Sequence, residues 1–272
     1  MSVYLISGVS SGIGFALLKS ISEDPQNLVV GLVRNTAATE QKIAAELGKR
    51  SNVHILHGDL TNYASLKQAA ADTAQIVGDR GIDYLVGNAG FPSHFDAYSP
   101  LGDLGEEPKE LDAVADKLFK TNVTGNIHLF NLFIPLVLKG KAKKVIAITS
   151  GHADLEFINN FDVENSALYS ASKAALNVIV AKFSAQYKKD GVLVFSLSPG
   201  AVEVGHFGDL TPKQTEGLMK FLGKAQAYAP HFKGPTPVDE AVPTIRSLWE
   251  RASIETGYGG AFVSHFGNKQ WL

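Results

Sequence analysis

Short apolar runs rich in Val, Ile and Leu alternate along the chain with longer segments whose apolar residues recur at helical spacing. Because the short runs are continuously apolar, they are typical of strands buried on both faces of a parallel sheet. The pattern predicts strands over Val3 to Ser7, Leu28 to Val33, Val53 to His57, Ile82 to Gly87, Lys144 to Thr149, Val192 to Ser198 and Ala261 to Ser264. It predicts helices over Gly12 to Glu23, Ala37 to Lys49, Asn62 to Val77, Leu111 to Leu138, Ala167 to Lys188 and Val238 to Arg251. We therefore expect a doubly wound α/β fold, with helices on both faces of a mainly parallel seven-stranded sheet.

Two regions depart from this alternation, Phe91 to Glu107 and Pro199 to Pro237, and both are rich in glycine and proline. Each follows a predicted strand at its carboxyl end, which is the edge where open α/β sheets bind ligands. We therefore expect one domain over residues 1–272, in which residues 199–237 form a substrate-loop region. An amphipathic helix from Pro212 to Leu222 is a candidate lid within this region.

Composition excludes several classes of protein. The chain has 25 Lys and Arg against 27 Asp and Glu, so no net basicity is available to neutralise a nucleic-acid backbone. No segment approaches the roughly 18 to 20 apolar residues that cross a bilayer. Without cysteine the chain has no disulfide or thiolate chemistry, and its first residues lack the pattern of a signal peptide. We expect a cytoplasmic protein that acts on a small molecule, without nucleic-acid or membrane partners.

A glycine-rich segment, Gly8-Val9-Ser10-Ser11-Gly12-Ile13-Gly14, follows the first predicted strand directly and opens a helix. Glycines there let the backbone turn tightly and approach a pyrophosphate, while the helix N-terminus offers free N–H groups. An ordinary strand-to-helix turn is the alternative, and the position after the first strand favours a nucleotide loop. Asp59-Leu60 and Asn88-Ala89-Gly90 follow two further strands, and so they belong to the same sheet edge.

The second predicted strand is followed by Arg34-Asn35, where NAD-binding sites of this architecture usually carry an acidic residue. A guanidinium can pair with a ribose 2′-phosphate through two hydrogen bonds. The sequence therefore favours NADPH/NADP⁺ over NADH, unless Arg34 is simply an exposed side chain at a strand end.

Tyr169 and Lys173 lie four residues apart on one predicted helix, hence on one face. A nearby cation favours the ionised form of a phenol, which would lower its pKa toward the range useful for acid–base catalysis. A pair exposed on the helix surface is the alternative. Ser150 follows the fifth predicted strand and could donate to a substrate carbonyl oxygen. Asn122 lies within an otherwise apolar helix, where its amide is either a satisfied structural group or part of a site network.

These motifs, in this order and over essentially the whole chain, resemble the short-chain dehydrogenase/reductase family. The matching elements are the glycine loop, the NAG turn, a catalytic tetrad and the segment after the sixth strand: Gly8, Gly12 and Gly14; Asn88, Ala89 and Gly90; Asn122, Ser150, Tyr169 and Lys173; Pro199 and Gly200. The resemblance implies a Rossmann-type fold and an NADP(H)-dependent carbonyl reductase or alcohol dehydrogenase that forms a homodimer or homotetramer. The C-terminal segment with Trp271 is more loosely similar to fungal norsolorinic acid ketoreductases.

The resemblance also implies a role for each site residue. Tyr169 would act as general acid and base, Ser150 would bind the carbonyl oxygen, and Lys173 would lower the pKa of Tyr169 and hold the nicotinamide ribose. Asn122 would hold a water that relays protons from Lys173. The implied cofactor-binding residues are Gly8, Ser10, Ser11, Gly12, Ile13, Gly14, Arg34, Asn35, Asp59, Leu60, Asn88, Ala89, Gly90, Tyr169, Lys173, Pro199, Gly200 and Val202, and no metal site is expected.

Three departures from the family pattern qualify the match. Ser7 replaces a Thr that usually opens the glycine loop, and Val204 replaces a Thr that often contacts the cofactor. Tyr169 follows Ser150 by 19 positions, a longer spacing than usual in the family. The extra residues, within 152–165, should bulge over the substrate entrance.

Several aromatic and apolar residues of the irregular regions are candidate walls of a substrate pocket: Phe91, His94, Phe95, His152, Leu155, Phe157, Phe161, Val204, Phe207 and Phe221. Any one of these residues could instead belong to the core. Two predicted helices are apolar on more than one face, which favours a partner subunit: their residues include Ile127, Leu129, Phe130, Leu132, Phe133, Val178, Ile179 and Val180. Two other functions remain open, a catalytically silent nucleotide-binding regulator and an enzyme of the same fold without net hydride transfer.

Overall fold

Seven strands form one parallel sheet in the order β3-β2-β1-β4-β5-β6-β9, in a computed structural model that describes residues 2–205, 208 and 210–272. The strands are β1 (Val3–Ser7), β2 (Leu28–Val33), β3 (Val53–His57), β4 (Tyr84–Gly87), β5 (Lys144–Ile148), β6 (Leu193–Ser198) and β9 (Phe262–Ser264). This confirms the predicted sheet. Strand β4 begins two residues later than expected. Just before it, the Asp83 carboxylate accepts hydrogen bonds from the N–H groups of Val3, Lys141 and Ala142.

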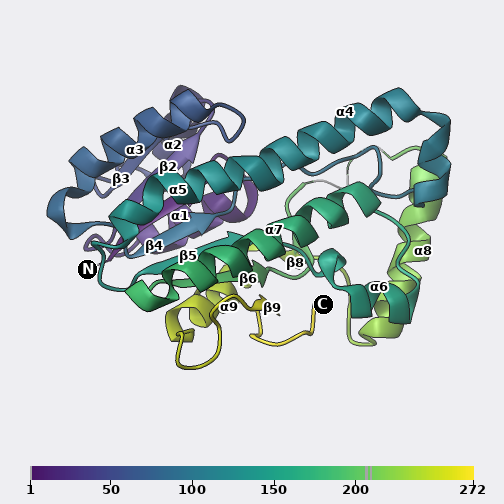
Figure 1. Ribbon diagram of the computed structural model, residues 1–272. Helices are drawn as coiled ribbons and strands as arrows, with labels where there is room; N and C mark the ends of the chain where they lie inside the picture. Colours follow the sequence, from purple (N-terminus) through teal and green to yellow (C-terminus); the bar gives the residue numbers. More distant parts are fainter. Residues whose placement is uncertain (1, 206–207, 209) are drawn as a thin grey trace.

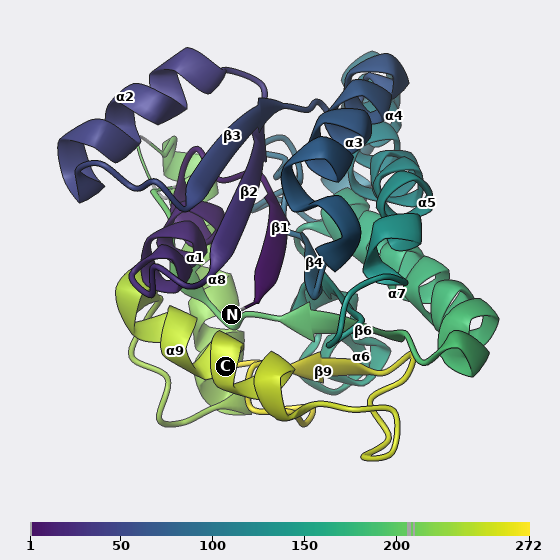
Figure 2. The ribbon, with the colours of Figure 1, turned by 90° about the vertical axis from the view of Figure 1, so that its left-hand side faces the viewer.

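Helices cover both faces of the sheet, as Figure 2 shows. One face carries α1 (Gly12–Ser22), α2 (Thr36–Leu47) and α9 (Val238–Arg251), and the other carries α3 (Tyr63–Val77), α5 (Gly125–Val137) and α7 (Ala167–Tyr187). Each layer buries its own apolar cluster against the strands, which explains why the strands are apolar on both sides. The predicted Rossmann-type architecture is therefore confirmed.

The long helix predicted from Leu111 to Leu138 is divided in two by a π-helical turn. Helix α4 (Pro108–Leu118) leads into a π turn (Phe119–Thr124) and then into α5, so that Figure 1 shows them as one continuous rod. The turn contains Asn122. Turns of this kind are rare and frequently lie at functional sites.

The two irregular regions contain short elements of their own. The first holds a 3-10 helix (Leu101–Glu106), and an antiparallel bridge joins Pro100 to Asn165. The second begins with β7 (Val202–Glu203), which pairs in parallel with β8 (Thr236–Pro237) and closes the base of the loop. Between these strands lies α8 (Pro212–Tyr228), which extends six residues beyond the predicted lid helix. Phe207, a candidate pocket wall, lies outside the described residues.

The extra residues between Ser150 and Tyr169 form an ordered helix rather than an irregular bulge. Helix α6 (Leu155–Phe161) is capped by Asp154, whose carboxylate accepts from the N–H of Phe157 at 3.0 Å. Helix α6 packs against α8, and both lie at the end of the molecule opposite β3 in Figure 1.

The apolar surface left on α5 and α7 is smaller than the sequence pattern suggested. Leu129, Phe130, Phe133 and Val180 are fully buried within the chain, whereas Val178 is 59% exposed. Along the described chain, no helix combines the length and apolar character that crossing a bilayer requires.

Candidate active site

The strand order changes direction on either side of β1, whose neighbours are β2 and β4. At such a switch point the loops after adjacent strands separate and leave a crevice at the carboxyl edge of the sheet. A cleft of about 590 Å³ lies there. It is lined by Ser7, Gly8, Ser10, Ser11, Gly12, Ile13, Leu32, Val33, Arg34, Gly58, Asp59, Leu60, Thr61, Leu66, Asn88, Ala89, Gly90, Phe91, Pro92, Lys117, Thr121, Ile148, Thr149, Tyr169, Lys173, Pro199, Gly200, Val202 and Val204.

The glycine loop and the NAG turn are joined by hydrogen bonds. The Ser7 hydroxyl accepts from the N–H groups of Asn88 at 3.1 Å and Ala89 at 3.0 Å, so serine supplies the hydroxyl that the family usually takes from Thr. The Asn88 amide donates to the carbonyl oxygens of Ser7 and Gly8. Gly8 has φ +76°, and a Cβ there would lie 2.9 Å from the Cα of Ala89. The two loops can meet this closely only because Gly8 has no side chain.

Most of the predicted cofactor residues line this cleft, but Gly14 and Asn35 are not among its described lining residues. A Cβ on Gly14 would collide with the Gly8 carbonyl oxygen and the Asn88 side chain, so this glycine allows α1 to pack closely on the loops. The Asn35 side chain caps α2 by accepting from the N–H of Ala38 at 3.1 Å. The structure therefore gives both residues supporting positions outside the cleft.

Cations gather where β2 meets α2. Arg34 is exposed at the cleft rim, and the Lys42 ammonium donates to the Ser10 carbonyl oxygen at 3.4 Å. Burial acts to raise the pKa of Asp59, but hydrogen bonds from Thr61 and the nearby Arg34 charge lower it overall. Sequence reasoning missed Lys42 because only the packing of α2 brings its ammonium to the glycine loop.

Tyr169 and Lys173 project from α7 into the centre of the site. Burial raises the pKa of Tyr169 to about 12, and a hydrogen bond with Ser150 offsets part of the shift. The net pKa shift of Tyr169 is therefore opposite to the expected lowering, because burial is its largest cause. Lys173 Nζ donates to the Ile148 carbonyl oxygen at 2.9 Å and lies 5.7 Å from the centre of the Tyr169 ring. Burial also lowers the pKa of Lys173 to about 8.

The Asn122 amide makes three hydrogen bonds. Its oxygen accepts from the N–H of Phe91 at 2.7 Å, and its nitrogen donates to the Phe91 carbonyl oxygen and to the Ser172 hydroxyl. Asn122 thus ties the loop after β4 to α7, next to Lys173. Since both amide hydrogens are engaged, a water held by Asn122, as the resemblance implies, would have to donate to one of its oxygens.

A second cavity, of about 260 Å³, lies beside Tyr169 and is mostly apolar. It is lined by Pro92, Ser93, His94, Ala97, Tyr98, Ser150, Gly151, His152, Phe157, Asn165, Ser166, Tyr169, Ser198, Gly200, Ala201, Val202, Leu218, Phe221, Trp271 and Leu272. The candidate walls His94, His152, Phe157 and Phe221 are in this set. Phe91 and Val204 line the first cleft instead.

Three other candidate walls are absent from the described lining of the second cavity. Leu155 is 70% exposed, Phe161 packs against Phe157 and Tyr228, and Phe95 is half-buried.

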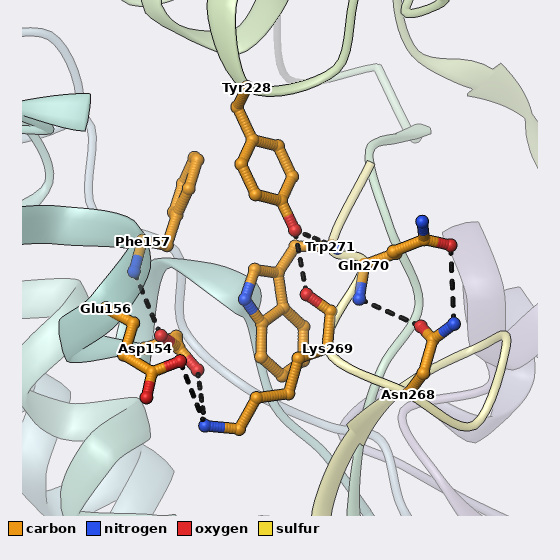
Figure 3. Close-up of polar contacts among 8 residues, drawn as sticks. All are labelled: Asp154, Glu156, Phe157, Tyr228, Asn268, Lys269, Gln270 and Trp271. Atoms are coloured by element: carbon orange, nitrogen blue, oxygen red, sulfur yellow. Dashed lines mark hydrogen bonds and ion pairs between the residues drawn. The ribbon is translucent and has the colours of Figure 1, made fainter. Parts of the chain in front are cut away.

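The C-terminal segment forms a wall of this second cavity that sequence reasoning did not assign. Tyr228, the last residue of α8, accepts from the N–H of Trp271 at 3.0 Å and donates to the Lys269 carbonyl oxygen at 2.7 Å, as Figure 3 shows. The Lys269 ammonium pairs with Asp154 and Glu156 at the start of α6. The tail therefore connects α8 to α6. A Cβ on Gly151 would lie 2.5 Å from Trp271, so a glycine admits the indole.

The residues of the first cleft fit a nicotinamide dinucleotide. The N-terminus of α1 opens into the cleft at Ser11, with no side chain capping its N–H groups. The Thr149 hydroxyl is buried there without a hydrogen-bond partner in the described chain. Such groups suit a bound phosphate and a polar ring substituent. Over residues 2–205, 208 and 210–272, no cluster of three or more His, Asp or Glu is placed to hold a metal ion.

Comparison with known proteins decides the family. A family model described as short chain dehydrogenase matches residues 2–215. The chain belongs to the short-chain dehydrogenase/reductase family. As a member it is an oxidoreductase that uses a nicotinamide cofactor and acts on small molecules.

Fungal relatives match this short-chain dehydrogenase/reductase over its entire length. It is 72% identical to short-chain dehydrogenase/reductase iacC of Pestalotiopsis fici and 50% identical to short chain dehydrogenase virK of Hypocrea virens, covering 100% of both chains in each case. Its fold is similar to that of NADPH-bound carbonyl reductase from chicken fatty liver, with a TM-score of 0.73, 23% identity and 98% coverage of both chains.

Asp96 is a further site residue that the sequence did not indicate. Its side chain is fully buried, and Oδ2 accepts from the N–H groups of Leu168 at 2.8 Å and Tyr169 at 3.1 Å. Its carbonyl oxygen accepts from the N–H of Ser166, the N-cap residue of α7, which has φ +57° and makes no side-chain capping bond to the helix. A carboxylate at a helix N-terminus also interacts favourably with the helix dipole. Asp96 therefore positions the first turn of α7, and with it Tyr169.

Replacing Asp96 should weaken the fold and misplace the phenol. In Asp96→Ala two buried N–H groups lose their acceptor, so we expect the free energy of unfolding to fall by about 1–3 kcal/mol. The kcat should fall with little change in the dissociation constant of the cofactor, and Asp96→Asn, which keeps an acceptor oxygen, should recover part of the loss. Thermal unfolding and steady-state kinetics measure both effects, with Asp112→Ala on the exposed face of α4 as control. An Asp96→Ala enzyme with unchanged kcat would contradict the positioning role.

Proposed function

We propose that the protein is an NADPH-dependent reductase that reversibly converts a ketone or aldehyde carbonyl to an alcohol, with Tyr169 as general acid and base. The position of Tyr169 carries this proposal, because its side chain lines both the nucleotide cleft and the apolar cavity. Lys173 lies on the cleft side and Ser150 on the cavity side. A carbonyl group in the cavity and a nicotinamide in the cleft would therefore meet at the phenol.

When bound, the nicotinamide supplies the hydride that the carbonyl carbon receives. Ser150 and Tyr169 would donate hydrogen bonds to the carbonyl oxygen, and Tyr169 would transfer its proton to that oxygen as negative charge develops. Because burial raises the pKa of Tyr169 to about 12, the phenol holds this proton throughout the neutral range. Lys173, mostly protonated at neutral pH, would stabilise the phenolate that remains.

Helix α8 has a role in this proposal as a lid over the substrate. Leu218 and Phe221, on the same helix, supply two of the apolar walls of the cavity. Two contacts would limit the movement of this lid. Strands β7 and β8 pair at its base, and Tyr228 at the end of α8 bonds to Trp271.

Removal of the phenol hydroxyl tests the reaction. In Tyr169→Phe the proton donor is lost, and general acid catalysis typically contributes about 10²–10⁴-fold, so we expect kcat to fall by that factor. Oxidation of NADPH with a panel of ketones and aldehydes, followed by absorbance, measures the rate, and NADPH titration should show unchanged affinity. Tyr187→Phe, on the same helix but outside both cavities, is the matched control. A silent nucleotide-binding protein would bind NADPH and oxidise it with no compound of the panel.

The preference for NADPH rests on the charges at the end of β2. Arg34 follows the strand where an acidic residue would suit NADH, and Lys42 adds a second cation at the Ser10 carbonyl. Both side chains would lie near a phosphate on the adenosine ribose. A guanidinium can bind that phosphate through two hydrogen bonds.

Arg34→Ala should remove most of this preference. We expect the unchanged protein to bind NADPH at least about tenfold more tightly than NADH, which corresponds to about 1.4 kcal/mol, and the variant to bind the two with similar affinity. Lys42→Ala should have a smaller effect in the same direction, and Lys49→Ala, an exposed residue just after the C-terminus of α2, should have none. Calorimetric titration with each cofactor measures the affinities. Equal affinities in the unchanged protein would rule out this role for Arg34.

We also propose that the protein forms a homodimer or homotetramer through the outer face of α7. Val178 is exposed there, beside the small side chains of Ala171, Ala174 and Ala181. Val178→Lys should therefore shift the protein toward monomer in sedimentation equilibrium, whereas Met219→Lys, an equally exposed change on α8, should not. A monomeric unchanged protein at micromolar concentration would refute the assembly.

A further inference from the structure

The cavity beside Tyr169 contains an imidazole whose polar atom has no partner. His152 lies two residues after Ser150 on a 3-10 turn, and its backbone N–H donates to the Ser150 hydroxyl at 3.3 Å. Its Nδ1 is buried and has no hydrogen-bond partner in the part of the chain that the structure describes. A buried polar atom without a partner costs free energy. Because His152 lines the cavity, a bound ligand could supply the missing partner.

The ring is held in place by aromatic side chains. The His152 ring lies 5.0 Å from that of Phe221, tilted by 31°, and meets the Phe157 ring at 88°. Burial lowers the pKa of His152 to about 4, although the charge of Asp96 acts in the opposite direction. The imidazole is therefore neutral at physiological pH, with one nitrogen that donates and one that accepts.

Three other polar side chains of the cavity already have hydrogen-bond partners. Asn165 and Ser166 both donate to the Ala97 carbonyl oxygen, at 2.8 and 3.0 Å, and Ser198 accepts from the N–H of Gly151 at 2.9 Å. The remaining wall near His152 is aromatic, with Phe157, Phe221 and Trp271. A ligand that fills the space beside His152 needs flat apolar surface and a hydrogen-bonding group for the imidazole.

We propose that His152 determines substrate specificity by hydrogen-bonding a second oxygen, a hydroxyl group carried on the ring of an aromatic ketone or aldehyde. This inference rests on the proposed reductase function. Because His152 and Ser150 share one short turn, the second oxygen lies close to the reacting carbonyl, and the aromatic walls take up the ring. A site built to pair with a hydroxyl discriminates strongly against the analogue that lacks it, since the polar group is then left unpaired.

Acetophenone and its ring-hydroxylated isomers are suitable probes. We expect the unchanged enzyme to reduce at least one hydroxylated isomer with a KM about tenfold or more below that of acetophenone, in the range of one buried hydrogen bond. His152→Phe should raise the KM of that isomer to the acetophenone value while changing kcat and the acetophenone KM little. His152→Gln, which keeps a donor and an acceptor, should restore part of the preference, and His231→Phe, on the exposed surface, should leave it intact.

A binding measurement separates this inference from the proposed reaction. Trp271 lines the cavity and the chain has only two tryptophans, so its fluorescence in a Trp249→Phe background reports ligand binding without turnover. Tighter quenching by the hydroxylated isomer that is lost in His152→Phe supports the inference even if no isomer is reduced, an outcome that would refute only the reductase function. Equal binding of acetophenone and all its hydroxylated isomers by the unchanged protein would overturn the role of His152. If His152→Phe fails to fold, His152→Gln and His152→Ala carry the comparison.

Discussion

The geometry of the site depends on how α7 begins. The buried carboxylate of Asp96 accepts hydrogen bonds from N–H groups in the first turn of the helix. These bonds fix the position from which the Tyr169 and Lys173 side chains extend. Since the two side chains are one turn apart, a single anchor positions both. The anchor comes from the loop after β4, the same loop that Asn122 ties to α7. The cleft and the apolar cavity both include Tyr169 in their lining. Contacts from α7 and from the loop after β4 together hold this side chain in place.

Buried polar side chains perform the same task at the other loops of the sheet edge. The Ser7 hydroxyl joins the turn after β1 to that after β4, and Ser198 joins the turn after β5 to the end of β6. Each connects neighbouring strands at a point where the ladder of backbone hydrogen bonds ends. Loops that would otherwise be free to move are thus held to one another, which preorganises both cavities before a ligand arrives.

Features set by local sequence were predictable, and features set by distant contacts were not. The bounds of β1, β2 and β3 and the position of the glycine loop follow from apolar runs and from glycine, which act within a few residues. Asp96 and Trp271 gave no such signal, because their partners lie some 70 to 120 positions away in the sequence. Helix α6 was missed for the same reason, since its apolar side chains pack against α8 and against Trp271 near the C-terminus.

The direction of the Tyr169 pKa shift shows the same limit and explains how the site is prepared. Sequence spacing reveals that a lysine lies near the phenol, but not that both are buried, and burial favours the neutral form of each. Burial therefore raises the pKa of Tyr169 to about 12 and lowers that of Lys173 to about 8. At neutral pH both groups then keep their protons. In the proposed reaction, this is the state in which the phenol can donate to the carbonyl oxygen while the Lys173 cation lies nearby. The burial that opposes ionisation of Tyr169 would therefore also prepare the site for reduction.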